Sequence, residues 1–467
     1  MSEQDTLPTR RQFLKGVGLV GATSTLLPLQ SSALAAPRSG RAKNLIFMVA
    51  DGMCHGTLGL AHHWNLRNVG LPLNWMMLYD RSDLRRSYQD TASASSPVTD
   101  SAAAASSWGC GQRVMNGSIN TAADGSSLKP LYDYAREAGK ATGLVTTCTI
   151  THATPAGFAT NVPKRGMEDV IARQYLEREV DVLLGGGRRY FKQAGDDGTI
   201  TDYIVKYREA GYAFAENRAS LKALSSERRK ILGLFAEGHM PYAIDRRNDK
   251  SLSDIPALDD MFEAALNALS GARDGFVLQV EAGRVDHAGH ANDAGAILHE
   301  LLEFDSCIPI ALEYTAKHPD TMLIVTTDHG TGGCQLDGSG AAYVESGPAL
   351  DRINLHRYSF EWLEKRFRAT GQFNAQSFTM ATGIRPCEEQ AAAVQAALDD
   401  PELKYLTSAM TEIFDKELKV MSSVGWSSNK HTAENVELLA LGPGSQGIPA
   451  QMQNFDLHGI IRQALGI

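Results

Sequence analysis

The chain has 467 residues, of which 43% are hydrophobic and 21% are charged, and its formal net charge is −9. This ordinary composition excludes a disordered or collagen-like chain. The acidic balance argues against a nucleic-acid footprint, and it would repel anionic substrates unless local charge reverses the field. The length allows two or three domains, or one large α/β domain.

Residues 1–35 carry the features of a twin-arginine signal peptide. Arg10 and Arg11 precede a mild apolar stretch over 16–29, and 33–35 form a small-x-small cleavage site. An ordinary amphipathic N-terminal helix is the alternative. The apolar stretch is too short to span a bilayer, and no other segment is apolar enough to do so. We therefore expect the twin-arginine machinery to export the protein to the periplasm or the medium.

The rest of the chain, 36–467, alternates short apolar runs with helical patterns. The runs predicted as buried parallel strands are Asn44–Ala50, Ala141–Thr147, Val180–Leu184, Phe276–Val280, Met322–Thr327 and Val436–Leu441. The helical patterns between them include Thr99–Trp108, Leu128–Ala138, Asp259–Ser270 and Ala294–Lys317. This alternation predicts one α/β domain with three layers, in which helices cover both faces of a central, mostly parallel sheet.

Two stretches interrupt the alternation, roughly 187–258 and 331–425. The second contains helical patterns near Ser359–Thr370 and Glu388–Leu398. Because strand-like runs resume after each stretch, we interpret both as inserted loop or helical segments of the same catalytic domain. The six cysteines are too few for a disulfide scaffold and show no CxxC spacing, so their pairing is not predicted.

Polar residues with metal-binding side chains lie next to the predicted strand ends. They are Asp51, Thr154, Glu281, Asp286, His290, Asp328, His329 and His431. Ligands of open α/β sheets bind beyond the carboxyl ends of the strands, so we expect these side chains to share one edge. A single Asp-Gly or Asp-His would indicate only a turn. Five independent segments that deliver such residues are hard to attribute to turns alone.

The donor types divide these residues by the metal they suit. An imidazole-rich set with room for an open position suits catalytic Zn²⁺ and comprises Asp286, His290 and His431. A second set of mixed donors comprises Asp51, Asp328 and His329. An oxygen-only set suits Mg²⁺ and comprises Asp51, Thr154 and Glu281. His152 and His287 are weaker candidates, because packed rings that support the ligands explain them equally well.

Ser101 is the candidate nucleophile. It begins the segment Ser101–Ala105, whose alanines favour a helix, and it follows Thr99 and Asp100. The simple interpretation makes Ser101 the helix N-cap; the alternative places its oxygen at the positive end of the helix dipole beside bound metals. Arg165 could contact phosphate oxygens with two donors, although a solvated arginine explains it equally well in isolation.

In these motifs the chain resembles the alkaline phosphatase family. The ordered motifs that carry the resemblance are Val49–Met53, Thr99–Ala102, His152–Pro155 with Arg165, Glu281 with Asp286 and His290, Asp328–Gly330, and His431–Thr432. The resemblance implies an exported, usually dimeric phosphomonoesterase with two Zn²⁺ and one Mg²⁺. It assigns Ser101 as the phosphorylated serine, Arg165 as the phosphate clamp, and the three sets above as the metal ligands.

The resemblance is incomplete at two positions and in one segment. Some members of the family carry Asp and Lys where this chain has His152 and His287, which leaves the third metal in question. The segment 331–425 has no counterpart that the resemblance identifies.

The runner-up function is a phosphodiesterase or another phosphate-releasing member of the superfamily, or a sulfatase. Those enzymes typically use threonine or a modified cysteine or serine as the nucleophile. A non-catalytic metal- or phosphate-binding protein would need no nucleophile, and a structural module would explain none of the strand-end residues. The sequence therefore favours hydrolysis of small phosphate monoesters through a covalent phosphoserine.

Overall fold

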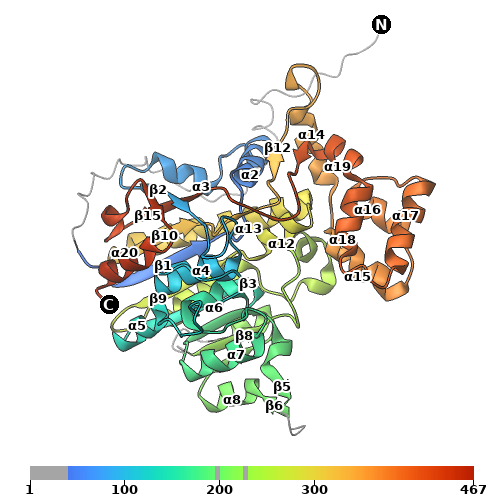
Figure 1. The fold of residues 1–467 in the computed structure, drawn as a ribbon. Coiled ribbons are helices and arrows are strands. Elements are labelled where there is room, and N and C mark those ends of the chain that lie inside the picture. Colours follow the sequence, from blue (N-terminus) through green and yellow to red (C-terminus); the bar gives the residue numbers. More distant parts are fainter. Residues whose placement is uncertain (1–39, 195–199, 225–229) are drawn as a thin grey trace, which may run out of the picture. The chain divides into compact units, whose positions relative to one another are not determined.

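A ten-stranded sheet forms the centre of the molecule (Figure 1). The computed structural model describes residues 40–194, 200–224 and 230–467, so the predicted signal peptide at 1–35 lies outside the described residues. From edge to edge the strands are β16 (Gln451–Gln453), β2 (Arg85–Asp90), β15 (Val436–Leu441), β10 (Thr321–Thr326), β1 (Asn44–Val49), β9 (Phe276–Glu281), β3 (Ala141–Thr149), β4 (Val182–Gly186), β8 (Ile231–Leu234) and β7 (Ala213–Ala215).

The sheet is mostly parallel, which confirms the predicted fold class. The prediction that Val436–Leu441 is a parallel strand is wrong, because β15 pairs antiparallel with both β10 and β2. Every other neighbouring pair in the described sheet is parallel. The segment 187–258, expected as an insertion, supplies β7 and β8 and so extends the sheet at one edge.

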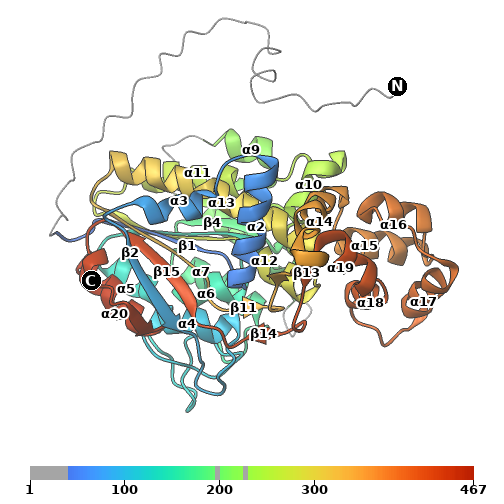
Figure 2. The same ribbon diagram turned by 90° about the horizontal axis from the view of Figure 1, so that it is seen from above.

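Helices cover both faces of the sheet because its central strands are apolar on both sides. In β1, Ile46 and Met48 face one hydrophobic cluster, while Leu45, Phe47 and Val49 face the other. The first cluster is covered by α2 (His55–Asn68), α11 (Leu258–Leu269) and α13 (Ala294–Lys317). The second is covered by α4 (Ser101–Cys110), α5 (Leu131–Glu137), α6 (Ala153–Ala159), α7 (Glu168–Glu177) and α20 (Asp456–Leu465). Figure 2 shows these two layers above and below the sheet.

The remaining elements are short and lie around this frame. The helices are α3 (Asn74–Met77), α8 (Tyr203–Glu209), α9 (Arg218–Lys222), α10 (Ala243–Asn248), α12 (Arg284–His290), α14 (Ser346–Arg352), α15 (Phe360–Thr370), α16 (Ala375–Thr382), α17 (Glu388–Asp399), α18 (Leu406–Ile413) and α19 (Asp415–Ser422). The strands are β5 (Lys192–Ala194), β6 (Ile200–Asp202), β11 (Gly330–Thr331), β12 (Gln335–Leu336), β13 (Val424–Gly425) and β14 (His431–Thr432). Among the described helices, none is both long and apolar enough to cross a membrane.

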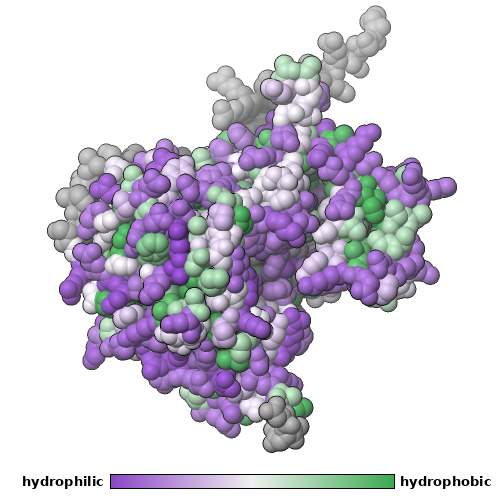
Figure 3. Space-filling view, viewed as in Figure 1, coloured by the Kyte–Doolittle hydropathy of each residue, from purple (hydrophilic) through white to green (hydrophobic). Residues whose placement is uncertain are grey.

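The helices α15 to α18 form a lobe with a hydrophobic core of its own. Phe360, Leu363, Phe378, Met410 and Phe414 are buried in it. Figure 3 shows a largely hydrophilic face with hydrophobic residues gathered over these helices.

The start of α15 ties the lobe to the α/β domain. Ser359 caps α15 and donates from its amide and hydroxyl to Asp245 at 2.8 and 2.6 Å. The amide of Phe360 donates to Asp293, the N-cap of α13, at 2.8 Å.

Candidate active site

The predicted site residues come together at the carboxyl edge of the central strands. Asp51 follows β1, Glu281 ends β9, and Asp328 follows β10. His431 reaches the same edge because β14, which contains it, pairs antiparallel with β11 and sets His431 opposite Thr331. The reversed direction of β15 explains this placement, since the start of an antiparallel strand lies at the carboxyl edge of its parallel neighbours.

Asp286, His290 and His431 form the first group. Asp286 and His290 stand one turn apart on α12, and the Nε2 atoms of both histidines lie 3.5 Å from the Asp286 carboxylate. The Nδ1 atoms of His290 and His431 lie 2.8 Å from the carbonyl oxygens of Asn429 and Thr99, so both must donate. A neutral ring then has its lone pair on Nε2, and the two Nε2 atoms are 3.0 Å apart. A cation between them would satisfy both lone pairs.

Asp51, Asp328 and His329 form the second group. His329 Nε2 lies 3.2 Å from Asp328 Oδ2 and 3.7 Å from Asp51 Oδ1. The Thr331 hydroxyl donates to Asp286 at 2.6 Å, so it can only accept from His329 Nδ1 at 3.3 Å. This contact leaves the His329 lone pair on Nε2, directed at the two carboxylates.

Asp51 and Glu281 belong to a third group, in which the structure also places His152. Thr154, predicted as the third oxygen ligand, donates to Asp51 Oδ2 at 3.2 Å. The Thr146 hydroxyl donates to the second oxygen of Glu281 at 2.5 Å. Asp51 therefore takes part in two neighbouring groups.

The buried carboxylates have the properties of a cation site. Asp51 Oδ1, Asp328 Oδ2 and Glu281 Oε1 are buried and have no hydrogen-bond partner among the described residues. Burial raises the pKa of Asp328 to about 6 and that of Glu281 to about 7. Burial and then the neighbouring carboxylates also raise the pKa of Asp51. Unpaired buried carboxylates are unfavourable, so the residues present fit divalent cations.

Ser101 stands at the N-terminus of α4, which is built from an alanine-rich sequence. The N-cap is Asp100, whose Oδ1 accepts from the amide of Ala103 at 3.0 Å. The simple interpretation of Ser101 as the cap is therefore wrong, and its hydroxyl is not used to end the helix. It is buried and lies 3.2 Å from His329 Nε2, beside the second group.

Arg165 is held from two sides near Ser101. Its Nη1 donates to Asp100 Oδ2 at 3.1 Å, and its Nη2 donates to His152 Nε2 at 2.8 Å. Its side chain is 31% exposed. Asp100 thus caps α4 and also holds the arginine.

His287 lies beside the third group, with Cys148 and His239. The spacing of these three side chains would allow a metal ion. However, His287 Nδ1 accepts from Arg284 at 2.9 Å and His239 Nδ1 accepts from the Thr149 amide at 3.1 Å. Both lone pairs are already used, and the Arg284 cation is adjacent, so this group does not have the properties of a cation site.

Gly52 lets the chain pass close to the first group. Its φ is +72°, and a Cβ there would lie 2.7 Å from Asp286 Cα. Its amide donates to Asp328 Oδ1 at 3.0 Å. Glycine is therefore required for both the backbone conformation and the close approach.

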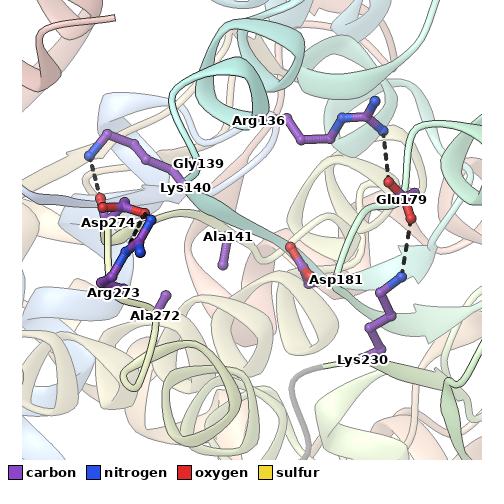
Figure 4. Close-up of a pocket in the computed structure, with 10 residues that line it drawn as sticks. All are labelled: Arg136, Gly139, Lys140, Ala141, Glu179, Asp181, Lys230, Ala272, Arg273 and Asp274. Carbon is purple, nitrogen blue, oxygen red and sulfur yellow. Dashed lines mark hydrogen bonds and ion pairs between the residues drawn. The ribbon is translucent and has the colours of Figure 1, made fainter.

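A hollow of about 460 Å³ lies at the opposite, amino edge of the strands (Figure 4). Several of its charges are paired with one another: Glu179 contacts Arg136 at 3.5 Å and Lys230 at 3.4 Å. Arg273 pairs with Asp274 at 3.0 Å. The other two charged groups bond to the backbone: Lys140 donates to the carbonyls of Lys43 and Asp274, and Asp181 accepts from the Thr142 amide.

The comparisons with known proteins agree with the motifs. The family model described as alkaline phosphatase matches residues 42–467. The chain belongs to the alkaline phosphatase family. This membership confirms the resemblance and places the chain among phosphatase hydrolases.

Individual alkaline phosphatases match over most of their length. Alkaline phosphatase 4 of Bacillus subtilis is 30% identical over 91% of this chain and 88% of its own. Alkaline phosphatase 3 of the same organism is 32% identical over 79% and 77%. The crystal structure of Thermus thermophilus alkaline phosphatase is 35% identical, covers 96% of each chain and has a TM-score of 0.82.

Three residues at the site are not among the residues predicted from the sequence. Asp100 caps α4 and holds Arg165, and Thr331 fixes the ring of His329. His239 lies in the segment 187–258, far from any motif. Asp100 and Thr331 lie within two residues of the motif residues Ser101 and His329, and this proximity could have indicated a role at the site. Nothing in the sequence indicates His239.

Proposed function

We propose that this protein is an exported, metal-dependent alkaline phosphatase that hydrolyses small phosphate monoesters through a phosphoserine at Ser101. The observation that carries the proposal is the position of Ser101. Its hydroxyl is not used as the helix cap and stands at the N-terminus of α4, 3.2 Å from His329 Nε2 and beside buried carboxylate oxygens that lack hydrogen-bond partners among the described residues. This places a nucleophile next to a cation site.

The donor chemistry supports two Zn²⁺ and one Mg²⁺. Asp286, His290 and His431 would hold one Zn²⁺, and Asp51, Asp328 and His329 the other. Asp51, Thr154 and Glu281 would hold Mg²⁺, because their donors are all oxygens. When bound, these cations would neutralise negative charge that develops on the serine, leaving-group and phosphoryl oxygens.

The residues of the chain perform an in-line displacement in two steps. Ser101 Oγ bonds to phosphorus as the ester bond to the alcohol breaks, and the serine proton leaves with the alcohol. Water then attacks the phosphoserine from the opposite side, which restores the Ser101 hydroxyl and releases inorganic phosphate. Arg165 holds the non-bridging oxygens, and the positive end of α4 favours the serine alkoxide.

The choice of monoesters rests on the charge around Ser101. Arg165 is hydrogen-bonded to Asp100, the residue before Ser101, and its guanidinium can bind two oxygens of a terminal phosphoryl group. A diester has one fewer ionised oxygen and would use this contact less well. The serine followed by alanine also lacks the modification motif of sulfatases.

The first experiment replaces Ser101 with alanine. We expect turnover of a phosphate monoester to fall by at least about 10³-fold, because the covalent step is lost. Metal content measured by elemental analysis should be unchanged. The control is Ser107→Ala on the same helix, since the Ser107 hydroxyl donates only to the Ala103 carbonyl at 3.0 Å.

Two further measurements separate this function from its alternatives. Rates on a phosphate monoester, a phosphate diester and an aryl sulfate should rank in favour of the monoester. Acid quenching should trap phosphate on Ser101. Full activity of Ser101→Ala, or a faster rate on the diester, would contradict the proposal.

Export through the twin-arginine machinery and assembly as a homodimer complete the proposal. Export rests on the motif within residues 1–35, and the dimer rests on the family.

A further inference from the structure

We infer that Glu361 of the lobe keeps a buried arginine, Arg284, from competing with cations at the metal site. The inference rests on the proposed function, in which the clustered carboxylates bind divalent cations. Arg284 begins α12, the helix that carries Asp286 and His290, and Glu361 lies in the first turn of α15. Their ion pair therefore joins the lobe to the helix on which one metal group is built.

The position of Arg284 is electrostatically unfavourable for a cation site. Its side chain is 3% exposed, and in the chain it lies between Glu281 and Asp286. Its Nη1 donates to His287 Nδ1 at 2.9 Å, and the His287 ring packs against His152 of the third group with centroids 5.7 Å apart. A buried charge is weakly screened by salt, so an unpaired guanidinium here would oppose the binding of divalent cations.

The carboxylates of the site offer Arg284 partners that it does not take. Carboxylates form strong charge-assisted hydrogen bonds with guanidinium groups. The neighbouring Gly283 lies against Glu281, since a Cβ there would be 2.9 Å from Glu281 Oε1. The Arg284 side chain nonetheless donates to Glu361 and His287. Three buried carboxylate oxygens are left without a hydrogen-bond partner among the described residues: Asp51 Oδ1, Asp328 Oδ2 and Glu281 Oε1.

Glu361 supplies the charge that compensates Arg284. Arg284 Nη2 donates to Glu361 Oε2, and the guanidinium carbon lies 3.9 Å from the centre of the Tyr242 ring. Burial raises the pKa of Glu361, but the charges of Arg284 and Lys365 outweigh this effect and lower the pKa to about 2. Glu361 is therefore ionised at neutral pH and holds the guanidinium on the side of the lobe.

The backbone before Glu361 fixes its place against α12. The amides of Ser359 and Phe360 donate to Asp245 and Asp293 of the α/β domain, both at 2.8 Å. A buried ion pair is costly to break, because the remaining charge has no partner. The start of α15 thus delivers a carboxylate to α12 from a segment that is distant in the chain.

Two substitutions, alone and combined, separate charge compensation from simple docking of α15. Glu361→Gln keeps the shape of the side chain and removes its charge. Arg284→Gln removes the cation and keeps an N–H that can donate. Denaturant titration first establishes that each metal-free variant is folded. Titration calorimetry with a competing chelator then measures the dissociation constants of Zn²⁺ and Mg²⁺.

We expect Glu361→Gln to weaken cation binding about tenfold, because the charge of Arg284 is then uncompensated. Arg284→Gln alone should bind cations at least as tightly as the unaltered protein. The double variant should return to within about twofold of the unaltered protein, since both charges are then absent. A double variant as weak as Glu361→Gln, or a tenfold loss in Arg284→Gln, would overturn the inference.

The matched control is Glu364→Gln on the same helix. The partners of this carboxylate, Arg368 and the Thr407 amide, both lie in the lobe, so cation affinity should be unchanged. A loss equal to that of Glu361→Gln would contradict the inference. If Glu361→Gln does not fold, Arg284→Gln still tests the inference, because it leaves no buried cation. Failure of the proposed function is distinct, because it would appear as a lack of turnover dependent on Ser101.

Discussion

Asp51 shows how one side chain links neighbouring parts of the site. Its carboxylate is shared by the group with Asp328 and His329 and the group with Glu281 and His152. Because burial and the adjacent acids raise its pKa, a cation in either group would favour its ionised form for the other. Metal loading at the two sites is therefore expected to be mutually reinforcing.

Gly52 gives a test at the level of a single residue. Gly52→Ala adds a Cβ 2.7 Å from Asp286 Cα at a φ of +72°, so both strain and displacement of Asp286 follow. We expect a loss of roughly 2–4 kcal/mol in the free energy of unfolding and at least about tenfold weaker Zn²⁺ binding. Denaturant titration and metal titration measure the two effects.

The matched control is Gly70→Ala. Gly70 has a φ of +80° but nothing within 4 Å of the added Cβ, so only the strain of roughly 1 kcal/mol should remain. Unchanged Zn²⁺ affinity in Gly52→Ala would show that the close approach does not position Asp286.

The sequence could predict the grouped side chains because each follows or precedes a strand that ends at one sheet edge. Asp286 and His290, spaced i and i+4, must also share a helix face. What it could not predict is the set of partners that fix proton positions, such as Thr331 for His329 and the Thr99 carbonyl for His431. These depend on packing between segments that are distant in the chain.

At the scale of elements, the central strands could be predicted and the edge strands could not. β1, β9 and β10 are buried on both faces, so their sequences are nearly continuous runs of apolar residues. β2 is Arg85–Asp90, polar and partly exposed, and β7 and β16 have three residues each, so their sequences carry little strand signal. The direction of β15 follows from the chain path and not from its composition.

The junction of α15 with the α/β domain is sensitive to pH. Burial raises the pKa of Asp245 from 3.8 to about 7, despite hydrogen bonds from Ser359. The folded protein therefore keeps the Asp245 proton between pH 4 and 7, while the unfolded chain loses it. The stabilising contribution is complete below about pH 4, decreases as pH rises, and is lost above about pH 7.

Asp245→Asn should remove this dependence, because an amide can keep both contacts to Ser359 without ionising. Between pH 4 and 7 the unfolding free energy of the unaltered protein should fall relative to the variant, by about 4 kcal/mol at most. Urea titrations of both proteins across this range measure the difference. Parallel curves would show that Asp245 does not titrate in this range.

At the scale of the whole molecule, net charge is a poor guide to the substrate. The formal charge of −9 includes Asp51, Glu281, Asp286 and Asp328, which face one another at the candidate site. Divalent cations there would reverse the local field, so an acidic protein could attract anionic phosphate esters.

This charge balance predicts that metals stabilise the fold as a whole. Removal of metal by a chelator should lower the melting temperature and abolish turnover, because the buried carboxylates then repel one another. Re-addition of Zn²⁺ and Mg²⁺ at about 100 times their dissociation constants should restore about 2.7 kcal/mol for each independent site. Ser101→Ala should show the same thermal recovery without turnover. An unchanged melting temperature after complete metal removal would rule out this linkage.

The chain leaves the domain and returns to it through two small strand pairs, β11 with β14 and β12 with β13. The segment between 337 and 423, which includes the helical lobe, is therefore an insertion whose two ends are held side by side by these strand pairs. A longer insertion adds little to the free-energy cost of closing it, since the closure entropy grows only with the logarithm of its length. His329 precedes the insertion and His431 follows it, and both lie next to the β11–β14 pair. Evolution could therefore remodel, shorten or replace the lobe while both histidines keep their register.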